Sequence, residues 1–434
     1  MKNYRKYLGV FYIVAAFIAI PLYNKGTFEN IGQHKVEAFY LINGIFFAAN
    51  LILNIISVFK VKKESNSASG KVMTSPNTME SPENLDIAVS IFVFMNFVSL
   101  LFSGNVKAAF YGVPDMGMGF LSVLIMGIVY FYIARNNNLT EPVIHAIAIS
   151  SVFPTVLTII NRLGFDPLNM YYEGENIKTN LYVSTLGNYS AFSTYMSIII
   201  PIVCFMAVFA ENKKVRYIYL ALLLVDIVSI MMVGTLATKV VTIFAVGIVL
   251  FWKIMPQIYI YHGVVIAVCA LCGLVYALII SIEISNPDFA NGRGFIWEIT
   301  RELFRSFPIR QKIIGAGTNC YMYSLSDFLM TNPKYLSACN ERFGDIALTS
   351  AHSEYLDYLI NTGLTGILSY CYVIYSALRT YAEKEEKDKF FRLSFLCITS
   401  YLINASVNYS NVLSTPFFFV FLGTLSYGKR TCDR

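Results

Sequence analysis

The sequence SNPDFANGRGFIWE (Ser285–Glu298) opens the longest polar segment of this chain, and AHSEYL (Ala351–Leu356) closes it. Between Glu283 and Ser353 lie several lysines and arginines and one of the four histidines of the chain. The sequence on either side is apolar enough to lie in a bilayer. Because a long polar segment between apolar ones is usually functional, we expect the functional site here. We expect the apolar segments around it to determine the fold.

The composition is that of a membrane protein. Of 434 residues, 56% are hydrophobic and only 14% are charged, whereas soluble domains carry about 25% charged residues. A helix needs about 20 apolar residues to cross the hydrocarbon core. We therefore predict an all-α, polytopic integral membrane helical bundle rather than a soluble enzyme with an anchor. The net charge of +6 does not indicate nucleic-acid binding, because the basic residues lie in short loops between apolar runs.

The apolar runs predict about 12 transmembrane helices. They cover residues 7–23, 38–59, 86–103, 117–134, 142–161, 187–210, 215–233, 239–255, 258–282, 355–378, 390–408 and 412–427. The chain then divides into residues 1–282 with helices one to nine, a large loop at 283–353, and residues 354–434 with helices ten to twelve and a short tail. No internal repeat is evident, so a transporter built from two symmetric halves is not favoured.

The distribution of lysine and arginine predicts the orientation. An even number of spans places both termini on one side of the membrane. If that side is the cytoplasm, the inner segments hold most of the 33 lysines and arginines, and the short outer segments hold few. Because cytoplasmic loops carry this excess, we expect both termini in the cytoplasm and the loop at 283–353 outside it.

A basic amphipathic helix is predicted inside this loop and ends at Pro308. On a helical wheel one face holds Ile296, Thr300, Leu303, Phe304 and Phe307, and the other holds Glu298, Arg301, Glu302 and Arg305. Such a helix suits the membrane surface, with Arg301 and Arg305 directed toward water or toward lipid phosphates.

Arg293 and His352 are the candidate reactive residues of the loop. Arg293 lies between Gly292 and Gly294, where the backbone can approach a ligand closely, and a guanidinium suits a phosphate or diphosphate. His352 follows Ser350, a potential cap for the tenth span. A histidine at a membrane boundary is usually only interfacial, but its neutral form can accept a proton from a sugar hydroxyl at physiological pH.

Lys239 and Asp226 are charges at membrane depth. Lys239 is the only charge between the seventh and eighth spans, and Asp226 lies inside the seventh. Ionisable groups at such positions are costly and often functional. For Asp226 the alternative is pairing with a nearby lysine or arginine.

The cysteines predict no metal site. Cys269 and Cys272 have the spacing of zinc ligands, but no second pair and no nearby histidine accompany them, so we expect them to pack in the membrane. Cys320 and Cys339 are the cysteines of the large loop. An oxidising exterior permits a disulfide between them, and two buried thiols are the alternative.

Four short motifs follow one another along the chain. They are Gly187–Phe192 leading to Pro201, Thr235–Lys239, Arg293 with Trp297 followed by Ile314–Gly317, and Ala351–Leu356 continuing to Gly363–Gly366. This set resembles the O-antigen ligase/polymerase family of bacterial envelope glycosyltransferases over residues 110–425, mostly in the order of its apolar segments. Two positions differ from the family pattern: Lys239 stands where Arg is usual, and Ser353 where Asn is common. Lysine offers a point charge in place of a two-pronged guanidinium.

The resemblance implies a multi-pass enzyme of the bacterial inner (cytoplasmic) membrane. It implies transfer of a glycan from undecaprenyl diphosphate to an acceptor hydroxyl, with no required metal or cofactor. The implied partners are the lipid-linked oligosaccharide, an acceptor glycan, the lipid bilayer and a chain-length regulator protein. With it we expect His352 to be the general base and Arg293 to stabilise the leaving group. The expected diphosphate-binding residues are Lys239, Arg293, Arg301 and Arg305.

We therefore expect a polymerase of polysaccharide repeat units, such as those of O-antigen, capsule or exopolysaccharide. One alternative is the ligase that transfers O-antigen to the lipid A core. Another is a polysaccharide flippase or other transporter. A transporter is expected to place charges within its spans, whereas this chain concentrates them in one loop.

The orientation can be tested with reporter fusions or cysteine labelling. Fusions at Ser65 should report the cytoplasm, and fusions at Asp327 should report the exterior. External labelling at position 65 would overturn the orientation and, with it, the assignment of the site to the outer side.

Overall fold

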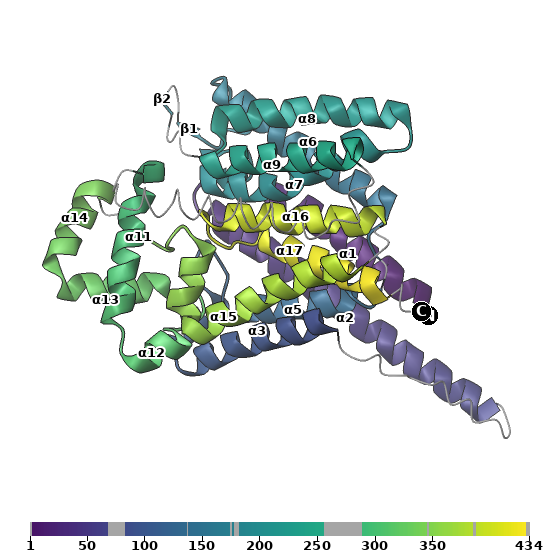
Figure 1. The fold of residues 1–434 in the computed structure, drawn as a ribbon, viewed down its shortest axis with the longest axis horizontal. Coiled ribbons are helices and arrows are strands. Elements are labelled where there is room, and N and C mark those ends of the chain that lie inside the picture. The colour runs from purple at the N-terminus through teal and green to yellow at the C-terminus, as the bar shows by residue number, and fades with distance from the viewer. Residues whose placement is uncertain are drawn as a thin grey trace.

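The computed structural model describes residues 2–67, 83–136, 138–173, 176–177, 182–255, 289–344, 347–384 and 388–430, which are almost entirely helical (Figure 1). The helices before the large loop are α1 (Lys2–Leu22), α2 (Ile31–Ser67), α3 (Asn84–Leu101), α4 (Val106–Tyr111), α5 (Phe120–Ile133), α6 (Glu141–Arg162), α7 (Tyr189–Phe209), α8 (Lys213–Val233) and α9 (Leu236–Ile254). The helices within and after this loop are α11 (Phe289–Ser306), α12 (Ile309–Ile314), α13 (Tyr321–Thr331), α14 (Pro333–Phe343), α15 (Glu354–Glu383), α16 (Lys389–Ala405) and α17 (Thr415–Arg430).

Short strands occur only between α6 and α7 in the described part of the chain. They are β1 (Tyr172–Glu173), β2 (Asn176–Ile177), β3 (Tyr182–Val183) and β4 (Gly187–Asn188). β1 pairs with β2, and β3 pairs with β4, each antiparallel. The second pair leads directly into α7 and so places the start of that helix.

Seven of the described helices are long and apolar enough to cross a membrane: α1, α2, α3, α6, α7, α8 and α9. They confirm the prediction of a helical membrane protein with several spans. Helices α5 and α17 are apolar but shorter. The ninth expected span, 258–282, lies outside the described residues.

Helix α5 begins later than the sequence predicted. The apolar run suggested a start near Gly117, but the helix begins at Phe120. Gly112 and Gly117 both have positive φ, of 89° and 59°, and they form a turn. A Cβ on Gly119 would lie 2.3 Å from the amide nitrogen of Gly112. This close backbone approach, which requires glycine, takes the first residues of the apolar run out of the helix.

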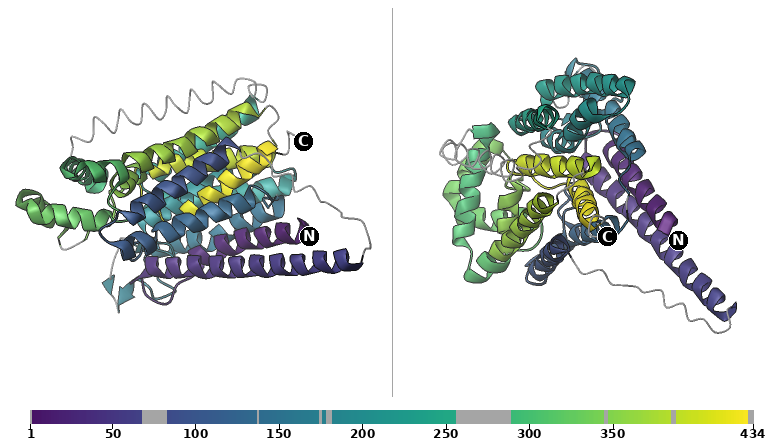
Figure 2. Two further views of the ribbon diagram at one scale, coloured as in Figure 1. Left: turned by 90° about the horizontal axis from the view of Figure 1, so that it is seen from below. Right: turned by 45° about the vertical axis from the view of Figure 1, so that its right-hand side comes forward.

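The long helices lie alongside one another and end at two opposite ends of the bundle (Figure 2). At one end, Asp86 at the start of α3 forms an ion pair with Arg430 at the end of α17 and accepts a hydrogen bond from Tyr130 of α5 at 2.8 Å. Lys389 and Glu141 pair there at 2.6 Å. Helices α11–α14 gather at the other end (Figure 1). The segments that the sequence assigns to the two membrane sides therefore separate in space.

Helix α15 is broken at Gly363, which has φ 66° and ψ −168°. The break frees the carbonyls of Ile360 and Asn361 from their partners within the helix. The N–H groups of Ala316 and Gly317 donate to these carbonyls at 3.1 and 2.9 Å. Because buried backbone groups must be paired, this crossing joins the end of α12 to the bundle.

The crossing also explains two of the glycines that the motifs contain. A Cβ on Gly315 would lie 2.2 Å from the carbonyl oxygen of Asn361, and a Cβ on Gly363 would lie 2.5 Å from the backbone of Ile313. Both glycines also have positive φ. The two glycines therefore allow this part of α15 to pack closely against the backbone that follows α12.

The predicted amphipathic helix is α11. Its apolar residues are buried, and its polar side carries exposed Arg301 and Arg305. The apolar side packs within a hydrophobic cluster that includes Leu303, Phe307, Tyr321 and Leu325. The apolar face of α11 is thus covered by its own chain, chiefly by α13 and α15, rather than left open for a membrane surface.

The two loop cysteines lie in different places. Cys320 packs with Leu100 and Ala109 of α3 and α4, whereas Cys339 belongs to the cluster around α11 and α13. Both are free and buried. The structure therefore supports the alternative of two buried thiols.

We expect both thiols to be free in the native protein. Alkylation after denaturation without a reductant should label Cys320 and Cys339 fully in peptide mass spectra, and dithiothreitol should leave the unfolding temperature unchanged. A Cys320–Cys339 cross-linked peptide under non-reducing conditions would contradict this packing.

Candidate functional site

The four sequence motifs meet around the connection between α16 and α17. Arg293 of α11 donates to the carbonyl oxygen of Val407, to the side chain of Asn408 at 3.1 Å, and to Ser190 Oγ at 3.2 Å. Ser190 lies in the first turn of α7. Trp297, one turn further along α11, packs with Ala237 of α9 and with Val407. Segments more than 100 residues apart thus form one cluster.

Arg293 is held but only partly buried. Its partners are a carbonyl, a hydroxyl and a side-chain amide, so none of these three contacts neutralises its positive charge. Through Ser190, Arg293 reaches the N-terminus of α7, where Asn188 is the N-cap and its Oδ1 accepts the N–H of Ala191 at 2.8 Å. A guanidinium beside a helix N-terminus favours an anion.

His352 lies close enough to Arg293 for the positive charge of the guanidinium to affect the imidazole. Its backbone has φ 51°, a left-handed conformation that is uncommon outside glycine. The imidazole packs edge-on against Tyr409, with ring centroids 5.4 Å apart and planes at 74°. Its Nδ1 is buried without a hydrogen-bond partner in the described structure.

Burial, and then the charge of Arg293, lower the pKa of His352 from 6.5 to about 3. The imidazole is therefore neutral at physiological pH and retains a free acceptor nitrogen. This is the protonation state that a general base requires. Anything that offsets the charge of Arg293 raises the pKa and makes the imidazole a stronger base.

Ser350 does not cap the following helix as the sequence suggested. Helix α15 begins at Glu354, with Ser353 at the N-cap position. Ser350 Oγ instead accepts the N–H of His352 at 3.2 Å. It forms a local turn, because a serine side chain two residues before an N–H can bond to that N–H.

Lys239 lies in the first turn of α9, close to the cluster but not bonded to Arg293. Within the described residues its side chain has no hydrogen bond or ion pair, and it is partly exposed. Ala237, two residues earlier, contacts the group around Trp297. Lys239 thus lies on the helix whose first turn borders the site.

Arg301 and Arg305 lie apart from the reactive pair. Both are exposed, and both pair with Glu302, at 3.4 and 2.7 Å. Exposed ion pairs of this kind contribute little to stability. The structure brings Arg293 and His352 together but does not bring these two arginines to them.

Asp226 lies in α8, away from this site. Both of its carboxylate oxygens are buried without a hydrogen-bond partner in the described structure, and no described lysine or arginine pairs with it. The pairing that the sequence analysis offered as an alternative is therefore not found among the described residues.

Several residues of the site were not singled out from the sequence. Asn408 and Tyr409 belong to the α16–α17 connection, and Tyr409 exchanges a hydrogen bond of 3.3 Å with Asn188. Arg162 at the end of α6 donates to the Tyr189 hydroxyl. The available signal was the run of asparagines 404, 408 and 411 between apolar segments, because polar groups at membrane depth are costly and often functional.

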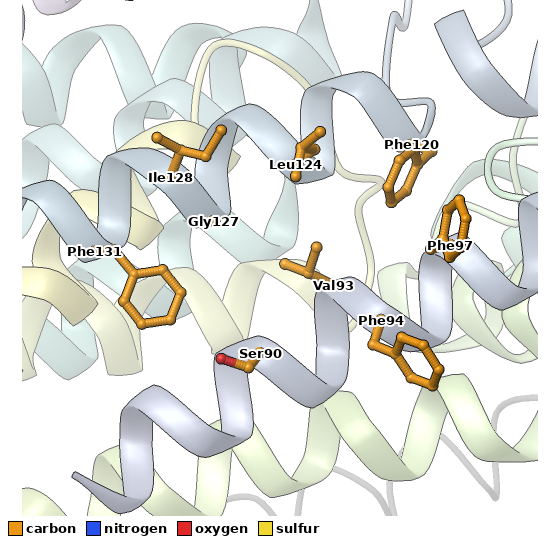
Figure 3. Close-up of a pocket in the computed structure, with 9 residues that line it drawn as sticks. All are labelled: Ser90, Val93, Phe94, Phe97, Phe120, Leu124, Gly127, Ile128 and Phe131. Carbon is orange, nitrogen blue, oxygen red and sulfur yellow. The ribbon is translucent and has the colours of Figure 1, made fainter. Parts of the chain in front are cut away.

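An apolar groove lies on the outer surface between α3 and α5 (Figure 3). It has a volume of about 350 Å³ and is lined by Ser90, Val93, Phe94, Phe97, Phe120, Leu124, Gly127, Ile128 and Phe131. Phe94 and Ile128 are exposed on its rim. Such a surface suits a hydrocarbon chain. In the described ranges, no three His, Cys, Asp or Glu side chains converge as metal ligands would.

No protein-family model matches this chain, and no curated protein matches it.

The influence of Arg293 on His352 can be measured directly. Diethyl pyrocarbonate acylates neutral imidazole, so its rate reports the protonation state of each histidine. In the wild type, modification of His352 should show no titration between about pH 8 and 5, because its pKa is depressed. In Arg293→Ala the pKa should rise but stay below 6.5, because burial, the larger cause, remains. The fall of the rate with falling pH should therefore begin at a higher pH than in the wild type. Equal pH profiles in both proteins, normalised to the His34 peptide, would contradict the coupling.

Proposed function

We propose that this protein is a polymerase of lipid-linked polysaccharide repeat units. The proposal includes about 12 spans, both termini in the cytoplasm, and the loop at 283–353 on the outer face of the bacterial cytoplasmic membrane. It includes membership of the O-antigen ligase/polymerase family, which rests on the four motifs. The supporting observation is that these motifs, far apart in sequence, surround one arginine and one neutral histidine.

Arg293 would bind the diphosphate of the donor. Its guanidinium is fixed by Val407, Asn408 and Ser190, so it is already oriented before a ligand arrives. Groups that are fixed in advance stabilise developing charge without reorganising. Lys239 would add a point charge from α9. Arg301 and Arg305 pair with Glu302 on the exposed side of α11. They would therefore not contact the reacting phosphates.

His352 would take the proton of the acceptor hydroxyl. The hydroxyl oxygen forms a bond to the anomeric carbon, and the bond from that carbon to the diphosphate oxygen breaks. The electron pair leaves with undecaprenyl diphosphate, beside Arg293, while the proton moves to His352. Because the bound diphosphate offsets the charge of Arg293, donor binding would raise the basicity of His352 when it is needed.

The polyprenyl chain of the donor needs an apolar path beside the site. The groove between α3 and α5 would offer one (Figure 3). These two helices also contribute residues to the cluster that contains Cys320 of the large loop. Seven of the nine residues that line the groove are bulky and apolar, and the other two are Ser90 and Gly127. The acceptor glycan would approach from the outer, polar side.

The ligase remains the second candidate, because both reactions use the same donor and the same acid–base chemistry. A transporter is less favoured, since the chain concentrates charges in its large loop, and the loop helices α11–α14 lie at one end of the bundle (Figure 1). The deletion phenotype separates the two enzymes. Loss of a polymerase leaves single repeat units on the surface acceptor, whereas loss of a ligase leaves long glycan on the lipid carrier.

Single substitutions in a complemented deletion strain test the mechanism. Arg293→Ala should abolish most polymer, and Arg293→Lys should restore only part of it, because one ammonium cannot replace a two-pronged guanidinium. His352→Ala should cost on the order of 10²–10⁴ in rate while donor lipid still binds. The readout is glycan ladder length on gels at matched protein level.

Arg305→Ala is the control and should have a mild effect, since this side chain is exposed on α11. Full-length ladders from both Arg293→Ala and His352→Ala would overturn the mechanism.

A further inference from the structure

The peptide groups on either side of Ala351 are held by two other elements. The N–H of Ala351 donates to Asp357 Oδ1 at 2.7 Å. Its carbonyl oxygen accepts the indole N–H of Trp297 at 3.0 Å. Ala351 is fully buried, and both partners are buried as well. The residue before His352 is therefore fixed by one bond from α15 and one from α11.

A third tie lies just after the histidine. The N–H of Glu354 donates to the carbonyl oxygen of Asn408 at 2.9 Å. Asn408 also accepts from Arg293. The turn that carries His352 is thus connected to the element that holds Arg293, and both ends of the turn have defined positions.

Helix α11 contributes to both reactive residues. Arg293 and Trp297 are four residues apart, so they lie on the same side of the helix. Arg293 bonds to Val407, and Trp297 packs on Val407 while bonding to Ala351. A rigid helix that carries the arginine and holds the histidine turn sets the distance between guanidinium and imidazole.

The backbone of His352 needs such support. A non-glycine residue at φ 51° lies in a sparsely populated region, and such residues persist only where the surroundings over-determine them. Catalytic geometry tolerates little error, since a displacement of about 1 Å can reduce a rate on the order of 10²-fold. The three hydrogen bonds therefore hold the turn at a position where a small displacement of His352 would reduce the rate.

The contacts of Asp357 allow a positioning role to be distinguished from a role in acid–base chemistry. Its second carboxylate oxygen has no hydrogen-bond partner in the described structure and lines a small cavity together with Asn319, Asn361 and Ser410. The influences on His352 come from burial and Arg293. The role of Asp357 toward the histidine is thus to accept one backbone N–H, which an asparagine oxygen can also do.

We propose that Trp297 and Asp357 are positioning residues that clamp Ala351 and thereby fix the imidazole of His352 relative to Arg293. This inference rests on the proposed function for its activity test, but not for its structural test. It assigns no proton transfer to Asp357 and no substrate contact to Trp297.

The structural test uses diethyl pyrocarbonate and peptide mass spectrometry on the full-length protein in detergent. Trp297→Phe keeps an aromatic ring but removes the five-membered ring of the indole with its N–H, and Asp357→Ala removes the acceptor. Both should increase the modification rate of His352 several-fold, because the turn becomes less ordered. Asp357→Asn should keep the wild-type rate. Trp252→Phe is the matched control, since Trp252 is the other tryptophan of the chain, is buried, and packs at a distance from this site.

The activity test measures kcat and KM with purified lipid-linked donor. Trp297→Phe and Asp357→Ala should lower kcat by between about 10- and 100-fold with the donor KM unchanged, and Asp357→Asn should restore kcat. In a His352→Ala background neither substitution should lower the rate further, because both act through the same imidazole.

Different results would overturn different conclusions. Unchanged His352 reactivity in both Trp297→Phe and Asp357→Ala would refute the clamp, whatever the activity. A loss of activity in Asp357→Asn equal to that in Asp357→Ala would refute a purely positional role. Full activity of His352→Ala would refute the proposed function while leaving the reactivity result intact. If Asp357→Ala does not fold, Trp297→Phe and Asp357→Asn decide the question alone.

Discussion

The structure depends on one constraint: buried backbone N–H and C=O groups must find hydrogen-bond partners. Where α15 breaks at Gly363, two carbonyls lose their helical partners in surroundings with little water, where each unpaired group is costly. The N–H groups of Ala316 and Gly317 pair with them. Only glycine at positions 315 and 363 lets the two backbones approach so closely. This pairing attaches the loop helices to the bundle, and so it also positions α11 and everything that α11 carries.

The site follows from that attachment. Helix α11 brings the Arg293 guanidinium to the connection between α16 and α17 and to the start of α7, and it brings the Trp297 indole to the turn before α15. In these contacts the arginine is bonded to neutral groups, and after burial its charge is the second cause that lowers the pKa of the neighbouring imidazole. An anion at Arg293 would reverse this effect of its charge. Under the proposed function, this one electrostatic interaction would couple donor binding to activation of the base.

Local patterns predicted much of this protein, but not all of it. Apolar runs located most helices, the period of α11 separated its two faces, and Arg293 and His352 were singled out before their proximity was known. Arg301 and Arg305 were predicted to bind the diphosphate together with Arg293, and in the structure both are exposed and pair with Glu302. Asn408 and Tyr409 were missed, because a polar pair near the end of an apolar run has no distinctive spacing. Their importance comes from contacts with residues more than 50 positions away.

By itself, the sequence determined the class of protein, since burial of apolar residues in a bilayer needs only length and composition. It also located most of the long helices, but not all of their ends. Helix α2 extends from Ile31 to Ser67, α15 is broken at Gly363, and α5 begins late because backbone contact near Gly112–Gly119 takes precedence over the apolar pattern. The tertiary structure alone decided that α11 covers its apolar face with its own chain, that the loop cysteines lie apart, and that Ala351 is held by Trp297 and Asp357. These three features depend on contacts between segments that are distant in sequence. The packing of the helices determines such contacts, and local periodicity does not encode them.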